Sequence, residues 1–137
     1  MKEYEERMEF RDILDDAIKR ELEHNPEIVS KEDKMLYIKE NAKVNPFTLA
    51  AMVGIEEVEI FPYIKSEIPE NLERRLNEVF ATVSILRKHH TPKEVNKILR
   101  TSSNLFDNNT FIGAMERGFT PQVLYRAELD FRRLNEG

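Results

Sequence analysis

Apolar residues recur every three or four positions along most of the chain, which is the spacing of amphipathic helices. The first such stretch runs from about Lys2 to His24, and Asn25-Pro26 ends it. Its apolar positions are Tyr4, Met8, Phe10, Ile13, Leu14, Ala17, Ile18 and Leu22. No stretch alternates Val, Ile or Thr with polar residues, so strand signals are weak throughout. The pattern predicts an all-α protein.

Short polar motifs indicate where the next helices begin. Ser30-Lys31-Glu32-Asp33 places a serine N-cap three residues before an acidic side chain, which predicts a helix to about Asn41. Asn45-Pro46 supplies an N-cap and a proline at the first helical position. Within the stretch Thr48–Lys65, Gly54 separates two short predicted helices.

The second half of the chain centres on a long predicted helix from Glu70 to about His89. Its apolar positions are Leu72, Leu76, Val79, Phe80, Val83, Ile85 and Leu86. Seven such positions in five turns predict the central packing helix. The motif Thr91-Pro92-Lys93-Glu94 is a second capping box and opens a helix to about Thr101.

The end of the chain is predicted as a turn followed by two further helices. Residues 102–109 are polar and turn-like, and a short helix from Thr110 ends at Gly118. Thr120-Pro121 opens the last helix. Its apolar side is formed by Val123, Leu124, Ala127, Phe131 and Leu134.

Composition narrows the class of protein. A chain of 137 residues corresponds to one domain, or one domain with an appendage. It has no apolar run near the ~20 residues that a membrane span needs, and its acidic start is unlike an export signal. We therefore expect a cytoplasmic protein without membrane contact. The lack of cysteine excludes disulfides and thiolate zinc sites, and the net charge of -5 disfavours general nucleic-acid binding.

Motifs of catalysis and metal binding are missing from the sequence. It has no glycine-rich phosphate loop, HExxH, GxSxG or acidic metal-binding loop. His89 and His90 would point about 100° apart on a helix, so they would not both face one metal unless the helix ended there, and a helix C-terminus favours their positive charge. The pairs Asp15-Asp16 and Glu56-Glu57 are interpreted as solvated faces. We expect no catalysis, no cofactor and no metal.

The segment Thr48–Ile64 has the spacing of a helix-turn-helix. Such a motif needs a small residue where its helices cross, a glycine in the turn and apolar residues that hold the second helix. Ala50, Gly54, Ile55 and Ile60 occupy those places. The spacing resembles the Cro/repressor-like (Xre) helix-turn-helix, with the preceding predicted helix as its first helix. An unspecialised helical hairpin is the alternative.

The second helix of this motif is poorly suited to reading DNA. Glu56, Glu57 and Glu59 would repel phosphates, and Pro62 falls inside the helix. We expect DNA binding to be weakened or lost. If operator DNA were contacted, the candidate residues are Thr48, Glu57 and Lys65.

From Ser30 onward, the order of parts resembles the Xre/MbcA/ParS antitoxins, in which a Cro-like helix-turn-helix precedes a small helical toxin-binding domain. The resemblance is carried by the joining helix Leu72–Leu86, Ile98-Leu99, the turn 103–110, Met115, Gly118 and the closing helix. The family's tryptophan and two of its prolines fall here at Lys97, Ser103 and Phe111. The expected division is an N-terminal extension (1–29), a helix-turn-helix-like domain (30–68), and a joining helix with a toxin-binding-like domain (69–137).

The resemblance implies a protein without catalysis that covers the active-site cleft of a RES-type, NAD-degrading toxin. The implied partner-binding residues are Leu99, Asn104, Leu105, Phe106, Asp107, Arg126, Arg132 and Arg133. Phe106 would be the aromatic anchor, and the arginines would line the cleft entrance. The plainer alternatives are a core role for Phe106 and a solvated helix face for the arginines.

Two other functions stay open. One is a helix-turn-helix repressor that binds its operator as a dimer. The other is a helical adaptor whose first helix recruits a partner or forms a homodimer. The apolar stripe of that helix, which includes Phe10, Leu14, Ala17 and Ile18, is wide enough for a partner or for the protein's own core.

Overall fold

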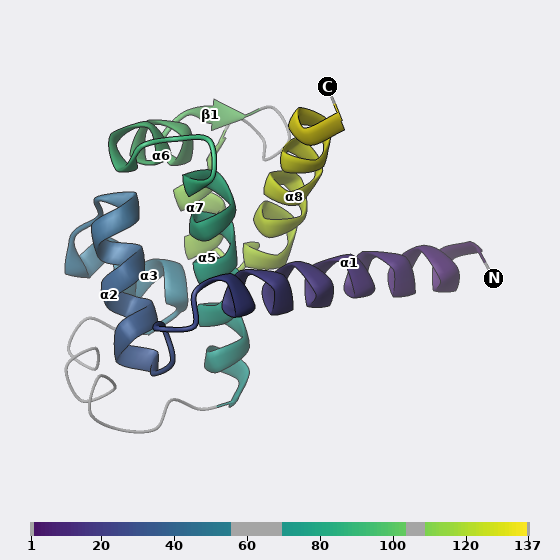
Figure 1. The fold of residues 1–137 in the computed structure, drawn as a ribbon, viewed down its shortest axis with the longest axis horizontal. Coiled ribbons are helices and arrows are strands. Elements are labelled where there is room, and N and C mark those ends of the chain that lie inside the picture. The colour runs from purple at the N-terminus through teal and green to yellow at the C-terminus, as the bar shows by residue number, and fades with distance from the viewer. Residues whose placement is uncertain (1, 56–69, 104–108, 137) are drawn as a thin grey trace.

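The computed structural model describes the backbone of residues 2–55, 70–103 and 109–136, and the side chains of residues 9–55, 72–102 and 109–135. Its helices are α1 (Lys2–His24), α2 (Lys31–Ala42), α3 (Pro46–Val53), α5 (Glu70–Arg87), α6 (Pro92–Leu99), α7 (Phe111–Glu116) and α8 (Thr120–Glu136). The short strands β1 (Ser102–Ser103) and β2 (Asn109–Thr110) pair antiparallel. The described chain is thus almost entirely helical, as the sequence predicted (Figure 1).

Helix α5 lies in the middle of the body, and the other helices pack around it (Figure 1). Its side chains Leu76, Val79, Phe80 and Val83 are fully buried. They share one apolar core with α2, α3, α6, α7 and α8, whose contributions include Ile38, Met52, Val53, Val95, Leu99, Met115 and Val123. The predicted role of α5 as the central packing helix is confirmed.

The predicted helix starts are confirmed at the level of individual hydrogen bonds. The Ser30 hydroxyl accepts a bond from the Asp33 amide at 3.0 Å, and the Asp33 carboxylate accepts one from the Ser30 amide at 3.3 Å. Thr91 and Glu94 make the same reciprocal pair at the start of α6. The Asn45 side chain caps α3, whose first residue is a proline. Each start is therefore fixed by residues within three positions of it.

The structure differs from the sequence prediction near the C-terminus. The stretch predicted as turn-like is bounded by two strands that pair with each other. Ser102 lies opposite Thr110, and Ser103 lies opposite Asn109. Strands of two residues are too short to show an alternating pattern, which explains why they were missed. Leu134, predicted on the apolar side of the last helix, is 58% exposed.

A single arginine joins the ends of α3 and α7 to α5. Arg75 donates from Nε to the Met52 carbonyl at 3.0 Å and from Nη2 to the Ala51 carbonyl at 3.2 Å, and it also bonds the Met115 carbonyl at the end of α7. Gly54 follows α3 with a left-handed φ of 86°. The predicted end of a helix at Gly54 is confirmed. The second helix of the motif lies outside the described residues, and the helix-turn-helix stays a prediction.

Helix α1 packs on the body with its C-terminal half and extends beyond it with its N-terminal end (Figure 1). Leu14, Ala17 and Ile18 are buried in a second apolar cluster formed by α1, α5 and α8. The core alternative for its apolar stripe is confirmed for these residues. None of the described helices is long and apolar enough to cross a membrane.

Candidate functional site: a groove beside a buried charged cluster

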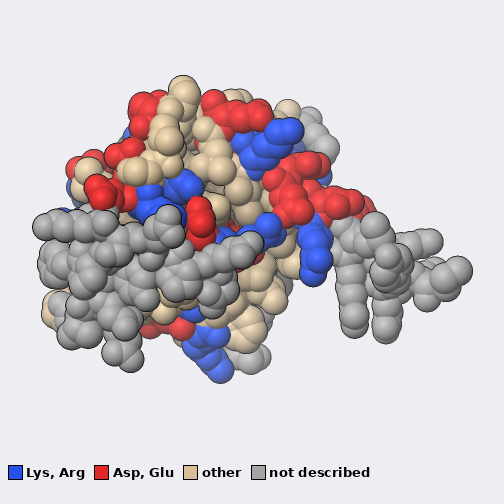
Figure 2. Space-filling model, turned by 90° about the horizontal axis from the view of Figure 1, so that it is seen from below, with Lys and Arg blue, Asp and Glu red and all other residues tan. Residues whose placement is uncertain are grey.

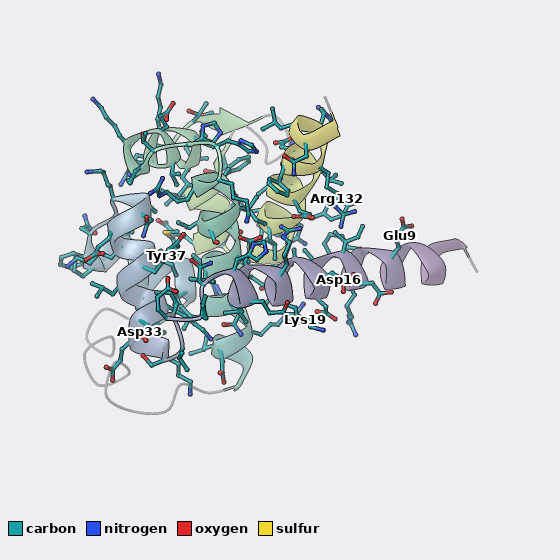
Figure 3. All side chains as sticks on the ribbon, viewed as in Figure 1. Glu9, Asp16, Lys19, Asp33, Tyr37 and Arg132 are labelled. Atoms are coloured by element: carbon teal, nitrogen blue, oxygen red, sulfur yellow. The ribbon has the colours of Figure 1, made fainter. Side chains whose placement is uncertain are left out.

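Two fully buried carboxylates, Glu21 on α1 and Glu128 on α8, form a cluster with basic side chains. The Arg20 guanidinium binds both oxygens of Glu128, at 2.9 and 2.6 Å, and its Nε donates to Glu21 at 2.7 Å. Arg132, one turn after Glu128, donates to the same carboxylate at 2.8 Å (Figure 3). The pair between Arg20 and Glu128 is bidentate, and a bidentate arginine–carboxylate pair fixes both the position and the orientation of the two side chains.

Helix α5 completes the cluster from the other side. Ser84 Oγ donates to Glu21 at 2.7 Å, Asn25 donates to Ser84 Oγ at 3.2 Å, and Lys88 Nζ lies 3.4 Å from Glu21. Among the described residues, every buried side-chain nitrogen or oxygen has a hydrogen-bond partner. The cluster therefore fastens α1 to α5 and α8 without leaving a buried polar group unsatisfied.

Both partners of the central pair are charged at neutral pH. The hydrogen bond to Glu128 raises the pKa of Arg20 against the opposing effect of burial. Burial alone would raise the pKa of Glu128, but hydrogen bonds from Arg20 and Arg132 lower it overall. A carboxylate held in its ionised form by two guanidinium groups is a poor proton donor near neutral pH. The cluster is thus suited to holding helices together.

The ring of Phe131 connects this cluster to a groove on the surface. The Arg20 guanidinium lies 5.0 Å from the ring centroid and Lys88 Nζ lies 5.6 Å from it, so two cations face the same ring. The His89 ring approaches it at 5.8 Å between centroids. Phe131 also forms part of the groove wall.

The groove has a volume of about 410 Å³ and lies between the C-terminal parts of α5 and α8, with residues of α6 and α7 closing it. Its lining residues are Ile85, Leu86, His89, His90, Ile98, Phe111, Ala127, Asp130, Phe131, Arg133 and Leu134. The volume falls within the roughly 300–1,000 Å³ of ligand pockets. Apolar side chains predominate, and His89, His90, Asp130 and Arg133 supply the polar groups.

Both adjacent histidines line this groove, which the sequence interpretation did not predict. The argument that they point about 100° apart assumes that the helix continues through them. Helix α5 instead ends at Arg87, so His89 and His90 lie in the turn that leads to α6. The capping box immediately after them was the signal for this end. Within the described residues, no group of three or more His, Cys, Asp or Glu side chains is arranged to hold a metal ion.

The predicted partner-binding residues are distributed between surface and core. Arg133 lines the groove. Arg126 is paired with Asp130 at 3.3 Å, and Arg132 is held by Glu128. Leu99 is fully buried, so it shapes the surface above it without being exposed to a partner. Asn104, Leu105, Phe106 and Asp107 lie outside the described residues.

Of the candidate DNA-contacting residues, the structure describes Thr48. It lies in the first turn of α3, half-buried, and its amide donates to the Asn45 side chain at 2.8 Å. Its main chain thus belongs to the cap of that helix. Glu57 and Lys65 lie outside the described residues.

Sequence reasoning missed the charged cluster because its members carry no local signature. Arg20 and Glu128 are 108 positions apart, and each looks like a solvated residue of an amphipathic helix. Only their burial between three helices distinguishes them. Phe131 was predicted as an apolar residue of the last helix, but nothing in the sequence placed cations over its ring.

Comparison with protein-family models, with curated proteins and with solved structures finds no match.

Proposed function

We propose that the protein is an antitoxin-like binding protein that inhibits a cognate toxin by covering its active site, without catalysis of its own. The observation that carries this proposal is the groove of about 410 Å³ beside Phe131. It lies in the region that the resemblance to the Xre/MbcA/ParS antitoxins assigns to toxin binding.

The composition of the groove supports a protein partner. Interface cores are enriched in aromatic residues and arginine, and a few anchors in well-packed pockets carry most of the binding energy. Here Phe131 forms part of the wall, Leu134 is 58% exposed, and Arg133 has no ion-pair partner among the described residues. A partner that inserts one apolar side chain would bury Leu134 and meet a cation at the rim.

The groove rests on rigid supports, which favours binding. Its floor includes Ile85 and Ala127, which are buried in the α1–α5–α8 cluster. The charged network around Glu128 fixes the helix that carries Phe131 and Arg133. A surface that is already ordered loses little conformational entropy when a partner binds.

The implied partner is a RES-type toxin, and the proposed mechanism is steric. The buried carboxylates Glu21 and Glu128 are already paired with cations, which supports binding rather than acid–base chemistry. DNA binding in this proposal is weak or lost, because the predicted second helix of the turn motif is rich in glutamate.

The test is co-expression with the product of the neighbouring reading frame, following growth, intracellular NAD and co-purification together. We expect rescue of growth and of NAD with a stable complex. The variant R133E/L134E should lose the complex and the rescue. The control R117E reverses an exposed charge outside the groove and should behave like the wild type.

Different failures have different meanings. If the neighbouring product is harmless and no complex forms, the antitoxin proposal is rejected. Rescue of growth with unchanged NAD would retain the inhibitor but reject an NAD-degrading partner. A complex that tolerates R133E/L134E would place the contact elsewhere on the molecule.

A further inference from the structure

The N-terminal end of α1 projects from the body of the molecule. Figure 3 shows Glu9 on the part of α1 that extends beyond α8. Among the described side chains, Phe10 lies at the outer end of the α1 interface, where its ring meets Tyr125 at 4.7 Å between centroids. The eight residues Lys2–Glu9 at 1.5 Å each add roughly 12 Å of helix beyond this contact.

The projecting segment is acidic and also carries apolar residues. Between Lys2 and Glu9 the sequence has four glutamates against one lysine and one arginine, together with a tyrosine and a methionine. The acidic character continues along α1 with the exposed side chains of Asp12 and Asp16, and Figure 2 shows acidic side chains gathered where α1 leaves the body.

Arg133 gives the groove beside Phe131 a positive charge that an acidic segment can meet. Most of the other lining residues are apolar, and the acidic lining residue, Asp130, is already paired with Arg126. The N-terminal end of α1 points away from the body of its own molecule (Figure 1). Helix α6 and the C-terminal end of α8, which border the groove, lie on another side of the body (Figure 1). Because α1 is one continuous helix anchored by Leu14 and Ala17, its end does not reach the groove of its own chain.

We propose that the N-terminal end of α1 from a second copy of this chain docks in the groove. Two copies that exchange their ends reciprocally form two equal contacts related by a two-fold axis, which closes the assembly as a dimer. The proposal concerns the same groove as the proposed function but does not rest on it, since it requires only the purified chain. A toxin that uses this groove would have to displace the second copy.

Two charge reversals test the contact from its two sides. Arg133→Glu changes the groove edge, and Glu9→Arg changes the projecting end. The matched controls are Arg117→Glu, on an exposed position outside the groove, and Glu23→Arg, on the exposed side of the same helix. Circular dichroism of each variant verifies that the helical fold is intact.

Sedimentation velocity over a wide concentration range measures the self-association. We expect a concentration-dependent dimer for the wild type and for both controls. Each reversal should weaken the dimer at least about tenfold, because the reciprocal arrangement loses the contact twice; tenfold corresponds to about 1.4 kcal/mol. An equimolar mixture of R133E and E9R chains should dimerise again, since each end then meets a groove of opposite charge.

Three outcomes would overturn the proposal. They are a monomer at every concentration, a dimer that is indifferent to both reversals, and a mixture of the two reversed chains that stays monomeric. The experiment contains no toxin, so its failure leaves the proposed inhibitor untouched, and a failed co-expression test leaves the dimer untouched.

Discussion

The Arg75 guanidinium is satisfied by main-chain carbonyl oxygens from two different helices. Burial lowers the pKa of Arg75, so the arrangement has to compensate for desolvation. It does so because the C-terminal ends of α3 and α7 both carry partial negative charge and both face this side chain. The neighbouring glycine leaves the space that the guanidinium occupies.

Gly54→Ala is expected to destabilise the protein more than Gly118→Ala. Both glycines have a left-handed φ, which costs about 1–2 kcal/mol for an alanine. At Gly54 the new Cβ would also lie 2.5 Å from Arg75 Nη1, whereas at Gly118 nothing lies within 4 Å. Chemical denaturation should show at least about 1 kcal/mol more loss at Gly54, reflecting displaced hydrogen bonds.

The same two substitutions in a variant that lacks the Arg75 side chain separate backbone strain from the steric clash with Arg75. In chains that carry Arg75→Ala, the two glycine substitutions should cost about the same free energy of unfolding, because only the backbone strain remains. If Gly54→Ala and Gly118→Ala already cost the same free energy of unfolding in the wild type, the close approach of Arg75 to Gly54 would contribute nothing to the difference in stability.

Glu128 makes the stability of the fold depend on pH in the acid range. Despite burial, hydrogen bonds from Arg20 and Arg132 hold its pKa below the ordinary value of 4.5. In the unfolded protein the Glu128 carboxyl group has its ordinary pKa of 4.5. The ionised carboxylate therefore contributes its full stabilisation above pH 4.5, and this stabilisation is lost as the pH falls through the lowered pKa of the folded state. Acidification should loosen the attachment of α1 to α8.

Glu128→Gln isolates this contribution. At neutral pH the variant should lose about 3 kcal/mol of unfolding free energy, because it leaves the half-buried Arg20 without its main carboxylate. Its stability should then fall less on acidification than that of the wild type, as measured by urea denaturation at several pH values. Glu23→Gln, on the exposed side of α1, is the control and should leave the pH profile unchanged.

At the scale of elements, α1 is attached to α5 and α8 by an apolar cluster and by two charged groups. In one group Arg74 bonds Asp15 at 2.7 Å and Glu78 at 3.3 Å, and Glu78 accepts a bond from Thr120 at 2.8 Å. The other group is the cluster around Glu128. In the apolar cluster, alanines at positions 17, 81 and 127 are buried and allow the three helices to approach closely.

Ala17→Leu should therefore detach or displace α1. Three added heavy atoms in a closely packed position typically cost about 1–3 kcal/mol. Hydrogen exchange should become faster along α1 than along α5, and the melting temperature should fall. Asp16→Leu adds an apolar side chain at the neighbouring exposed position and should leave exchange in α1 unchanged. Equal effects of the two variants would contradict close packing at Ala17.

The helices were predictable from the sequence because their limits depend on neighbours along the chain. Ser30 with Asp33, Thr91 with Glu94, and Asn45 each determine a start through a side chain within three positions. The apolar spacing of the long helix likewise placed α5 in the core. Features of this kind are encoded within one or two turns.

The candidate site was less predictable because it is assembled from distant segments. The expected grouping of Arg126, Arg132 and Arg133 on one surface ignores their partners, and two of the three are held by acidic residues of α8. The groove also depends on where α5 ends, and on Leu134 remaining exposed at the edge. Pairing, burial and helix ends of this kind follow from tertiary packing.

At the scale of the whole molecule, one apolar core spans segments that the sequence assigned to different domains. Met35 and Val53 pack in the same cluster as Phe80, Val95 and Val123. Helix α5 also takes part in the second cluster with α1 and α8. No boundary between independent cores separates these described helices.

We therefore expect the described body to unfold in one cooperative transition. Far-ultraviolet circular dichroism, which follows the helices, and near-ultraviolet circular dichroism, which follows the tyrosines, should give the same midpoint and the same slope in denaturant. Tyr37 on α2 and Tyr125 on α8 report on opposite parts of the chain. Two separated transitions would show that the segments on either side of residue 69 fold independently.

Phe131 takes part in both the charged cluster and the groove, since its ring lies under the Arg20 and Lys88 cations and also lines the groove. An aromatic ring current shields protons that lie above its face. The side-chain methylene protons of Arg20 and Lys88 should consequently resonate upfield in a proton magnetic resonance spectrum. The same few signals would report, without any label, both that α1 is seated and that something has entered the groove.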